Sequence, residues 1–479
     1  AIISPLAGCY KSDEAYIYFE LPSKPATIDP QTAKTDSELL IVKNIFEGLM
    51  RKDSNGQTVT GIAQSVEKNG LVYTFKLRNN AKWNNGDKVT AHDFAFAFKR
   101  ALLPETKAPF ASRLYCIKNA EAVHAGSKSA DALGITVIDD KTLKIELSYD
   151  DARFLDNLTT SVAMPCNQKF FNESAGKYGL FRENIVGNGS YRLAKWSKDT
   201  FGIRLYRNEH YTGDFVAKNA AVFLTCDTKK SVVEKLKGNS IDMSFIDSSA
   251  RKEMESLGFK TVELQNICWV MTMNGDLSKN MRKALMKLVG SEKYIKNLPD
   301  GYSRATSIYP AILGTNFSSD GIEAYDLEGG KNLYQTEVLK LADRKFPSNI
   351  TLYYYENGTV KPMITDILGH WQSNLSAFVK LESASSPEVL LPELKNQTLS
   401  MAVFPIRADS ENPAEYLVNF GISYKGGDLS KIQKQLLEGK NILPIAFQNT
   451  MICYSPAIKE IFTIKGDGFI DFSFIVKKK

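Results

Sequence analysis

The chain has 479 residues, of which 43% are hydrophobic and 24% are charged. That composition is ordinary for a soluble globular protein and excludes a largely disordered, collagenous or coiled-coil chain. No uncharged run reaches the length of a membrane-spanning helix. The net charge of +6 is spread along the chain, so we expect no nucleic-acid partner. The length allows about three domain-sized units or one large two-lobed architecture.

The N-terminal segment, AIISPLAGC, is short, apolar and rich in small residues, and a polar stretch follows it. It resembles the end of a secretory signal peptide. Leu6-Ala7-Gly8-Cys9 resembles the bacterial lipobox, in which the cysteine thiol takes a lipid, so Cys9 is the expected lipidation site. The alternative is a chance tetrapeptide in a disordered tail.

The other five cysteines are widely spaced and form no C-x-x-C pair, so we interpret them as small buried hydrophobic residues. They are Cys116, Cys166, Cys226, Cys268 and Cys453. The four histidines are scattered and form no H-x-x-x-H pair. The sequence therefore predicts neither a metal site nor a cofactor.

Apolar spacing and turn residues predict the elements of the first half of the chain. We expect a helix over 37–49, a strand over 72–77, a hairpin from 135–138 and 142–147, and a strand pair from 191–196 and 201–207. Thr90 is the predicted N-cap of a helix that ends before Pro104, with Asp93 as its partner in a capping box. Gly187-Asn188-Gly189 lacks the third glycine and the following helix of a nucleotide-binding loop, so we interpret it as a turn.

The second half of the chain predicts a parallel sheet. A helix is expected over 280–289, followed by a strand at 349–355, a helix at 360–375 and a strand at 378–382. The last three elements form a βαβ unit, whose crossover is right-handed. Ligands favour the carboxyl ends of the strands in such a sheet.

Several motifs then follow one another in the order typical of one family. They are Thr27-Ile28-Asp29-Pro30, Phe46-Glu47-Gly48-Leu49, the block from Phe75 to Phe94 that contains Lys82-Trp83, Gly86 and Val89-Thr90-Ala91-His92-Asp93-Phe94, Gly187-Asn188-Gly189-Ser190-Tyr191, and Asn274 followed by Met281-Arg282-Lys283-Ala284-Leu285. The chain resembles the extracytoplasmic solute-binding proteins of the peptide-binding class of ABC importers, most of all the oligopeptide-binding proteins. The resemblance covers nearly the whole chain and is densest from about residue 21 to residue 290.

The resemblance implies an α/β fold: a two-lobed architecture of the periplasmic-binding-protein type, class II, with an extra α+β domain inserted in the first lobe. Residues 1–9 would be the signal-peptide remnant. The first lobe would hold residues 10–50, 161–265 and 455–479, the inserted domain residues 51–160, and the second lobe residues 266–454.

The resemblance also implies the ligand-binding residues. Asp409, in Ala408-Asp409-Ser410-Glu411-Asn412-Pro413, matches the family's aspartate that pairs with the α-ammonium of a peptide. The peptide would add as a strand between Lys24-Pro25-Ala26 and Pro405-Ile406-Arg407. The expected pocket walls are Phe110, Ile246, Asp247, Trp269 and Met271. The alternatives are that Asp409 is a solvated loop acid or N-cap, and that the aromatic and Met residues are plain core.

The chain departs from the family at the expected site. Pro25 and Pro405 have no N–H to donate to a peptide, and Ile406 stands where the family has Trp. We also expect the stretch between Leu417 and Pro444 to be shortened and to lack a helix. A narrower or altered ligand specificity would follow from these departures.

We therefore expect a protein that captures oligopeptides and delivers them to a membrane permease. It would be an extracytoplasmic monomer tethered to the cell membrane through Cys9. The alternative is a sensory lipoprotein, or a binder of one peptide or of a non-peptide ligand, on the same fold. No G-x-S-x-G or H-E-x-x-H motif supports an enzyme, and Asp139-Asp140 lies in a hairpin turn, where it favours turn formation.

Overall fold

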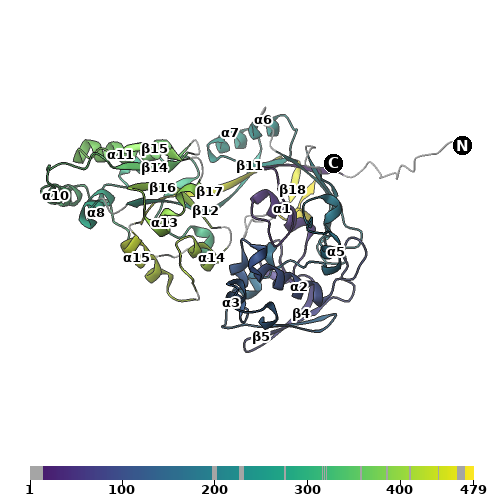
Figure 1. Cartoon of the computed structure of the whole chain (residues 1–479). Coiled ribbons are helices and arrows are strands. Elements are labelled where there is room, and N and C mark those ends of the chain that lie inside the picture. Colours follow the sequence, from purple (N-terminus) through teal and green to yellow (C-terminus); the bar gives the residue numbers. More distant parts are fainter. Residues whose placement is uncertain are drawn as a thin grey trace.

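Two lobes joined by long strands make up the molecule in the computed structural model (Figure 1). The structure describes residues 15–196, 202–225, 231–273, 277–314, 317, 319, 321–356, 359–384, 387–408, 411–424, 426–440, 442–460 and 470–478. This arrangement confirms the predicted two-lobed α/β fold. Among these residues, no helix combines the length and the apolar character needed to cross a membrane.

One large mixed sheet runs through both lobes, in the order β15-β14-β16-β12-β17-β11-β1-β10-β9-β8, with β13 paired to β17. Its strands are β1 (Tyr16–Leu21), β8 (Tyr191–Lys195), β9 (Ile203–Arg207), β10 (Ala220–Thr225), β11 (Met243–Ile246), β12 (Lys260–Met273), β13 (Tyr302–Arg304), β14 (Thr351–Tyr355), β15 (Lys380–Ala384), β16 (Met401–Arg407) and β17 (Ile442–Tyr454). The strand pair predicted around residues 191–207 is confirmed as antiparallel β8 and β9.

Strands β12 and β17 belong to both lobes. They have 14 and 13 residues, and they pair antiparallel along nearly their whole length. The part of β12 from Ile267 to Met273 pairs with β16 in the second lobe, and the end of β17 from Met451 to Tyr454 pairs with β11 in the first. The register shifts between Gln265 and Ile267, so a bulge at Asn266 marks the passage between the lobes. The predicted boundary at 265/266 coincides with this bulge, although the domain bounds themselves remain a prediction.

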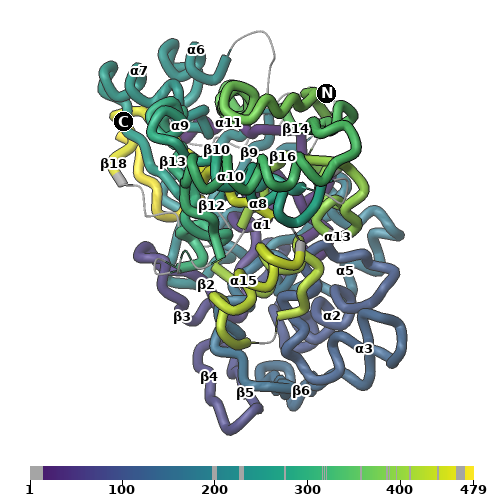
Figure 2. The backbone as a smooth tube through the Cα atoms, turned by 90° about the vertical axis from the view of Figure 1, so that its left-hand side faces the viewer, coloured from purple at the N-terminus to yellow at the C-terminus, as the bar shows by residue number. Residues whose placement is uncertain are grey.

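The first lobe and the region predicted as inserted share one hydrophobic core. A separate antiparallel sheet, β4-β5-β7-β6, lies at the opposite end of this half from α6 and α7 in both views (Figures 1 and 2). The smaller strands are β2 (Met50–Lys52), β3 (Thr58–Thr60), β4 (Ala63–Asn69), β5 (Val72–Leu77), β6 (Ile135–Asp139), β7 (Thr142–Glu146), β18 (Ile458–Glu460) and β19 (Val476–Lys477). The helices are α1 (Asp36–Ile45), α2 (Ala91–Leu102), α3 (Ala120–His124), α4 (Phe154–Asn157), α5 (Gln168–Glu173), α6 (Val232–Lys237) and α7 (Arg251–Ser256), with a 3-10 helix, η2 (Ala111–Leu114).

The start and end of α2 and the β6–β7 hairpin are found where capping and turn residues predict them. The Asp93 carboxylate accepts the Thr90 N–H at 2.8 Å, which is the return bond of the predicted capping box at the start of α2. The helix ends at Leu102, before Pro104, and the predicted hairpin is β6 paired with β7. Burial raises the pKa of Asp93 to about 6.

Two of the family motifs, the one that contains Glu47 and the one that contains Asn188, contact each other in the fold. The Asn188 side chain accepts the Glu47 N–H at 3.0 Å and donates to the Glu47 carbonyl at 2.8 Å. A Cβ on Gly187 would lie 2.2 Å from the Ile45 carbonyl oxygen, so only glycine lets this turn approach the end of α1. The turn around Asn188 is therefore a clamp on α1 and not a phosphate-binding loop.

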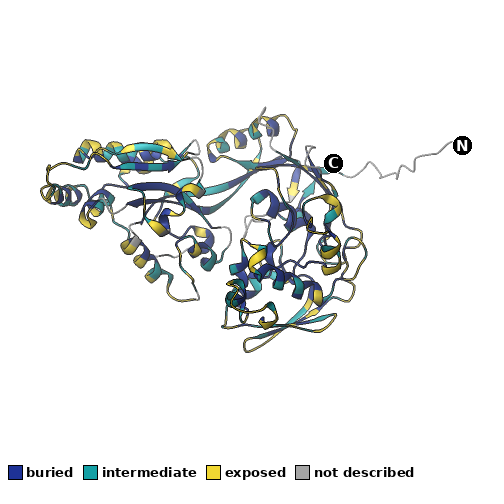
Figure 3. Ribbon diagram, in the orientation of Figure 1, coloured by how far each residue is buried: buried dark blue, intermediate teal, exposed yellow. Residues whose placement is uncertain are grey.

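The second lobe has helices on both faces of its part of the sheet. Trp269 and Met271 point into the core beneath α8 and α11, whereas Cys268 and Val270 point into the core beneath α14 and α15. This alternation is the period of two expected of a strand. The helices are α8 (Lys279–Lys287), α9 (Glu292–Lys296), α10 (Leu327–Val338), α11 (Val360–Leu375), α12 (Pro387–Leu390), α13 (Glu393–Asn396), α14 (Pro413–Val418) and α15 (Leu429–Lys440). Figure 3 shows the central strands buried and the outer faces of these helices exposed.

The predicted βαβ unit is confirmed, with β14 and β15 parallel and joined by α11 over the predicted range. The expectation that the stretch between Leu417 and Pro444 lacks a helix is wrong, because α15 occupies residues 429–440. Leu429, Ile432, Leu436 and Leu437 recur at helical spacing and pack in or against the core beneath α14.

The interpretation of the cysteines as buried hydrophobic residues is confirmed for the four described ones. Cys116, Cys166, Cys268 and Cys453 are buried and free. Burial raises the pKa of Cys166 to about 12 and that of Cys453 to about 11, so both thiols stay neutral. Cys226 lies outside the described residues.

Candidate functional site between the lobes

The two segments predicted to hold a peptide lie at the carboxyl ends of strands. Lys24-Pro25-Ala26 follows β1, and Pro405-Ile406-Arg407 ends β16. In the first segment Lys24 and Ala26 are exposed and Pro25 is buried. This is the end of an α/β sheet at which ligands bind.

A buried carboxylate fixes the first segment. Glu38 in α1 accepts four backbone N–H groups, those of Ala26 and Thr27 at 3.0 and 3.2 Å and those of Lys34 and Thr35 at 2.9 and 3.0 Å. The Ala26 N–H is therefore already bonded, and Pro25 has none. Any ligand that pairs with this segment must rely on its carbonyl groups and on Lys24.

The second segment has one open edge. Strand β16 pairs with β12 along its full length, from Met401 to Arg407. On its other side β14 pairs with it only as far as Val403. Among the described residues, no strand pairs with Phe404, Pro405 and Ile406 on that side, so this is the edge at which an extended ligand would add.

Side-chain contacts join the lobes on the side where α14 lies. Arg407 at the end of β16 reaches Asp36 in the first turn of α1, with 2.5 Å between Nη1 and Oδ2. Arg113 in η2 and Glu415 in α14 form an ion pair of 2.7 Å in which the Arg side chain is 2% exposed. Asn412 donates to the Asn157 side chain at 3.2 Å. Figure 1 shows α14 of the second lobe facing the half of the molecule that holds α1 to α5, below the strands that run between the lobes.

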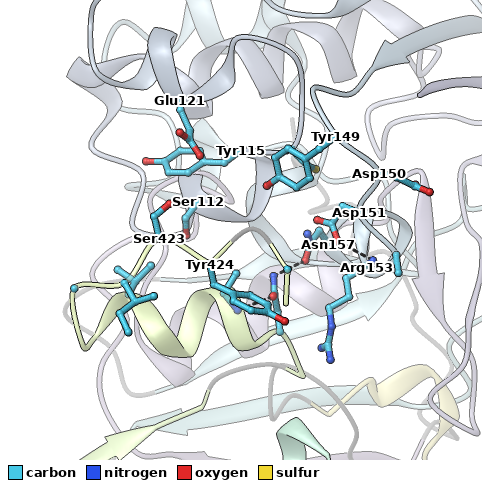
Figure 4. A pocket seen from close by; sticks show the side chains of 18 residues that line it. Ser112, Tyr115, Glu121, Tyr149, Asp150, Asp151, Arg153, Asn157, Ser423 and Tyr424 are labelled. Carbon is cyan, nitrogen blue, oxygen red and sulfur yellow. Dashed lines mark hydrogen bonds between the residues drawn. The ribbon is translucent and has the colours of Figure 1, made fainter. Parts of the chain in front are cut away.

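A cavity of about 460 Å³ lies beside these contacts and takes its walls from both sides. Tyr115 and Tyr149 stand on one side of it and Tyr424 on the other (Figure 4). The remaining charged or polar lining includes Glu121, Asp150, Asp151, Arg153, Asn157 and Asn412. Its volume is in the range of small-molecule sites, about 300–1,000 Å³.

The tyrosines and the thiol in this cavity are held neutral. Burial, followed by the charge of Glu121, raises the pKa of Tyr115. Burial is also the main reason that the pKa values of Tyr149 and Cys116 are raised, and Asp151 adds to both shifts. These side chains offer aromatic faces and hydrogen-bonding groups, but no nucleophile that is ionised near neutral pH.

The predicted pocket walls do not gather in one place. Phe110 is half-buried and stacks on Arg113, whose guanidinium carbon lies 4.5 Å from the ring centre, so it borders the interlobe contacts. Trp269 and Met271 are completely buried in the second-lobe core, and the Trp269 indole donates to Gln448 at 2.7 Å. Trp269 and Met271 are therefore core residues, as the alternative interpretation of the sequence has it.

Two more predicted wall residues lie in the first lobe. Ile246 ends β11 and is half-buried, and the exposed Asp247 caps the 3-10 turn that follows. Asp409 and Cys9 lie outside the described residues, so the role of each remains a prediction.

Sequence reasoning missed Glu38 and the cavity residues. Thr35 and Glu38 have the T-x-x-E spacing of a capping box, a signal that could have revealed Glu38. The cavity tyrosines have no local signal, since residues near 115–150 and near 424 meet only through the fold.

A two-lobed α/β molecule with a cavity between its halves defines a ligand-binding protein rather than a plain scaffold. The chain matches the bacterial extracellular solute-binding proteins, family 5 Middle, over residues 57–428, and it belongs to that family.

Individual relatives agree with this membership. The chain is 26% identical over 417 residues to the oligopeptide-binding protein OppA of Bacillus subtilis (strain 168), which covers 84% of this chain and 76% of the relative. Over 190 residues, which make up 39% of this chain and 35% of the relative, it is 36% identical to the periplasmic murein peptide-binding protein MppA of Escherichia coli (strain K12). The crystal structure of Haemophilus influenzae OppA in complex with RPPGFSPFR shares the fold, with a TM-score of 0.79 at 22% identity over 98% of this chain and 99% of that one.

Proposed function

We propose that this protein is the substrate-binding component of an ABC importer, which captures oligopeptides between its lobes and delivers them to a membrane permease. The observation that supports this most is the edge of β16 beyond Val403, which β14 does not cover, in a molecule that also has a cavity with walls from both lobes. An extended peptide pairs with such an edge through its main chain, and its side chains occupy the adjoining space. The names of the relatives support the ligand class.

The proposal also gives a role to Asp409 and to Cys9, which lie outside the described residues. Asp409 pairs with the peptide α-ammonium, because a carboxylate offsets part of the cost of burying that charge. Cys9 bears the lipid that keeps the protein on the outer side of the cell membrane. The permease recognises the closed form, and the protein binds without catalysing a reaction.

The experiment that tests the proposal is native mass spectrometry of protein purified without denaturation. We expect a series of bound masses that fragment as peptides, and titration calorimetry with those peptides should show binding. A ligand-free protein that binds no peptide from a mixed digest would overturn the proposal. Hydrolysis of the peptides by the purified protein would contradict the non-enzymatic role.

A second candidate is a receptor for one peptide or for a non-peptide ligand. The first segment favours it, because Pro25 lacks an N–H and Glu38 holds that of Ala26, which removes donors used in general main-chain recognition. The same mass spectrum separates the two candidates. A single bound mass indicates the specialised receptor, and a heterogeneous ladder indicates the general one.

A further inference from the structure

Backbone donors are scarce in the segment 22–27, which follows β1 at the carboxyl end of that strand. Two of its residues are prolines, which have no N–H. The Ser23 N–H donates to the Ser37 hydroxyl at 3.0 Å, and Glu38 accepts the last two N–H groups of the segment. The N–H that is left belongs to Lys24, and no described residue accepts it.

The ammonium group of Lys24 is a second donor. Lys24 is exposed, and among the described residues none forms a hydrogen bond or an ion pair with this group. The two carboxylates in the first turn of α1 already have partners. Glu38 is buried and holds four backbone N–H groups, and Asp36 pairs with Arg407. One residue therefore offers a backbone N–H and a positive charge at the end of the sheet where ligands bind.

Lys24 lies close to the contact between the lobes. Ser23, the residue before it, is bonded to Ser37 through both its N–H and its hydroxyl, at 3.0 and 3.1 Å. Asp36, the neighbour of Ser37 in α1, reaches Arg407 at the end of β16 in the second lobe. A ligand held between the lobes therefore has Lys24 within its reach.

We infer that Lys24 binds a carboxylate of the ligand, which is either the C-terminal carboxylate of a short peptide or an acidic side chain. The inference rests on the proposed function, since it names the ligand group that one first-lobe residue binds. A carboxylate has two oxygens and accepts the N–H and the ammonium together, and such charge-assisted bonds are stronger than neutral ones. A basic group would meet a like charge, and a neutral carbonyl would gain only the weaker bond.

The scarcity of other donors makes this contact selective. A segment with several free N–H groups would hold any main-chain carbonyl, whatever the charge of the ligand. In this segment the remaining N–H is coupled to a positive charge, so the first lobe gains most from an anionic group.

The test is titration calorimetry of the full chain with tetra-alanine, with its C-terminally amidated form, and with tetrapeptides in which one position holds glutamate or glutamine. If Lys24 binds the C-terminus, amidation should weaken binding about tenfold, and if it binds a side chain, glutamate at one position should bind about tenfold more tightly than glutamine. Lys24→Gln keeps the backbone N–H and removes the charge. This variant should lose most of the difference while its affinity for the amidated or glutamine peptide stays, and Lys24→Glu should reverse the preference.

Lys34→Gln is the matched control. Lys34 is also exposed and lies on the neighbouring stretch that Glu38 holds, but its own N–H already donates to Glu38 at 2.9 Å. The control should keep the full difference, and equal melting temperatures would show that all variants fold. An equal effect of the two glutamine substitutions, or affinities that depend neither on amidation nor on glutamate, would overturn the role of Lys24 alone. Absence of binding by every peptide would overturn the proposed function as well.

Discussion

At the scale of single residues, Glu38 is the side chain on which the first-lobe segment depends most. It is 2% exposed and accepts four backbone N–H groups from two stretches of chain. A carboxylate has acceptor sites for all four, whereas the glutamine amide has one oxygen and a donor that faces other donors.

Glu38→Gln should therefore lower the free energy of unfolding by about 3 kcal/mol, the cost of leaving buried donors without acceptors. Urea denaturation monitored by circular dichroism measures it. The exposed Glu67→Gln is the control and should change stability by less than about 0.5 kcal/mol. Equal unfolding midpoints for the two variants would contradict the role given to Glu38.

Asp409 gives the second residue-scale prediction. If it pairs with a buried peptide ammonium, Asp409→Ala should weaken the binding of free-amine peptides by about 2–5 kcal/mol. Calorimetry with each peptide and its N-acetylated form separates the charge from the rest of the site. The substitution should have little effect on acetylated peptides. Normal binding of free-amine peptides by the variant would show that Asp409 is a loop acid.

How far the site could be predicted differs between residues. The motif match leads to Arg407, and the structure gives it a task that spacing does not show, an ion pair with Asp36 across the lobes. Trp269 and Met271 look like pocket walls in the sequence, yet strand alternation turns both into the core. Tyr424 could not be predicted, because its partners Tyr115 and Tyr149 lie about 300 residues earlier in the chain.

At the scale of elements, the helices and strands that local signals predict are present, although the helix expected over 37–49 ends at Ile45. Helix α11 and strand β5 match their predicted ranges, and the Thr90–Asp93 pair starts α2 as expected. Helix α15 was missed because comparison with a family suggested a shortened segment, although its own apolar spacing indicates a helix. The bulge at Asn266 has no local signal, since it arises from pairing with β17.

The clamp on the end of α1 gives the element-scale prediction. Asn188 is 1% exposed and satisfies both backbone groups of Glu47, the residue just after the helix end. Asn188→Ala leaves a buried N–H and a buried C=O unpaired, so stability should fall by about 2–4 kcal/mol. Thermal unfolding measures the change.

Asn172→Ala is the comparison for the clamp, because Asn172 is exposed on α5 and should shift stability by less than about 0.5 kcal/mol. A loss in Asn188→Ala no larger than this would mean that water replaces the amide and that the turn is not a clamp.

At the scale of the whole molecule, the lobes are joined in two different ways. The strands β12 and β17 are a permanent covalent and hydrogen-bonded connection, with a bulge at Asn266 where the sheet bends. The contacts of Arg113, Asn157 and Asp36 with the second lobe are side-chain contacts that an opening motion would break. A hinge of this kind closes around a ligand when the closed state gains more contacts than it loses.

The Arg113–Glu415 pair gives the prediction for closure. Both side chains are nearly buried, at 2% and 12% exposure, so closing removes two charges from water and joins them at 2.7 Å. In Glu415→Gln, closing still buries Arg113, but an uncharged amide replaces the carboxylate that it contacts at residue 415. The closed form should therefore lose at least about 2 kcal/mol, which corresponds to ligand dissociation roughly 30-fold faster.

Stopped-flow measurement of ligand release tests this prediction, and small-angle scattering of the ligand-free protein should show a larger radius of gyration for the variant. Glu292→Gln is the matched control, because Glu292 is an exposed residue at the start of α9 in the second lobe. Its release rate and radius should equal those of the unmodified protein. If Glu415→Gln releases ligand at the same rate as this control, closure does not depend on the ion pair and rests on the ligand and the Arg407–Asp36 contact instead.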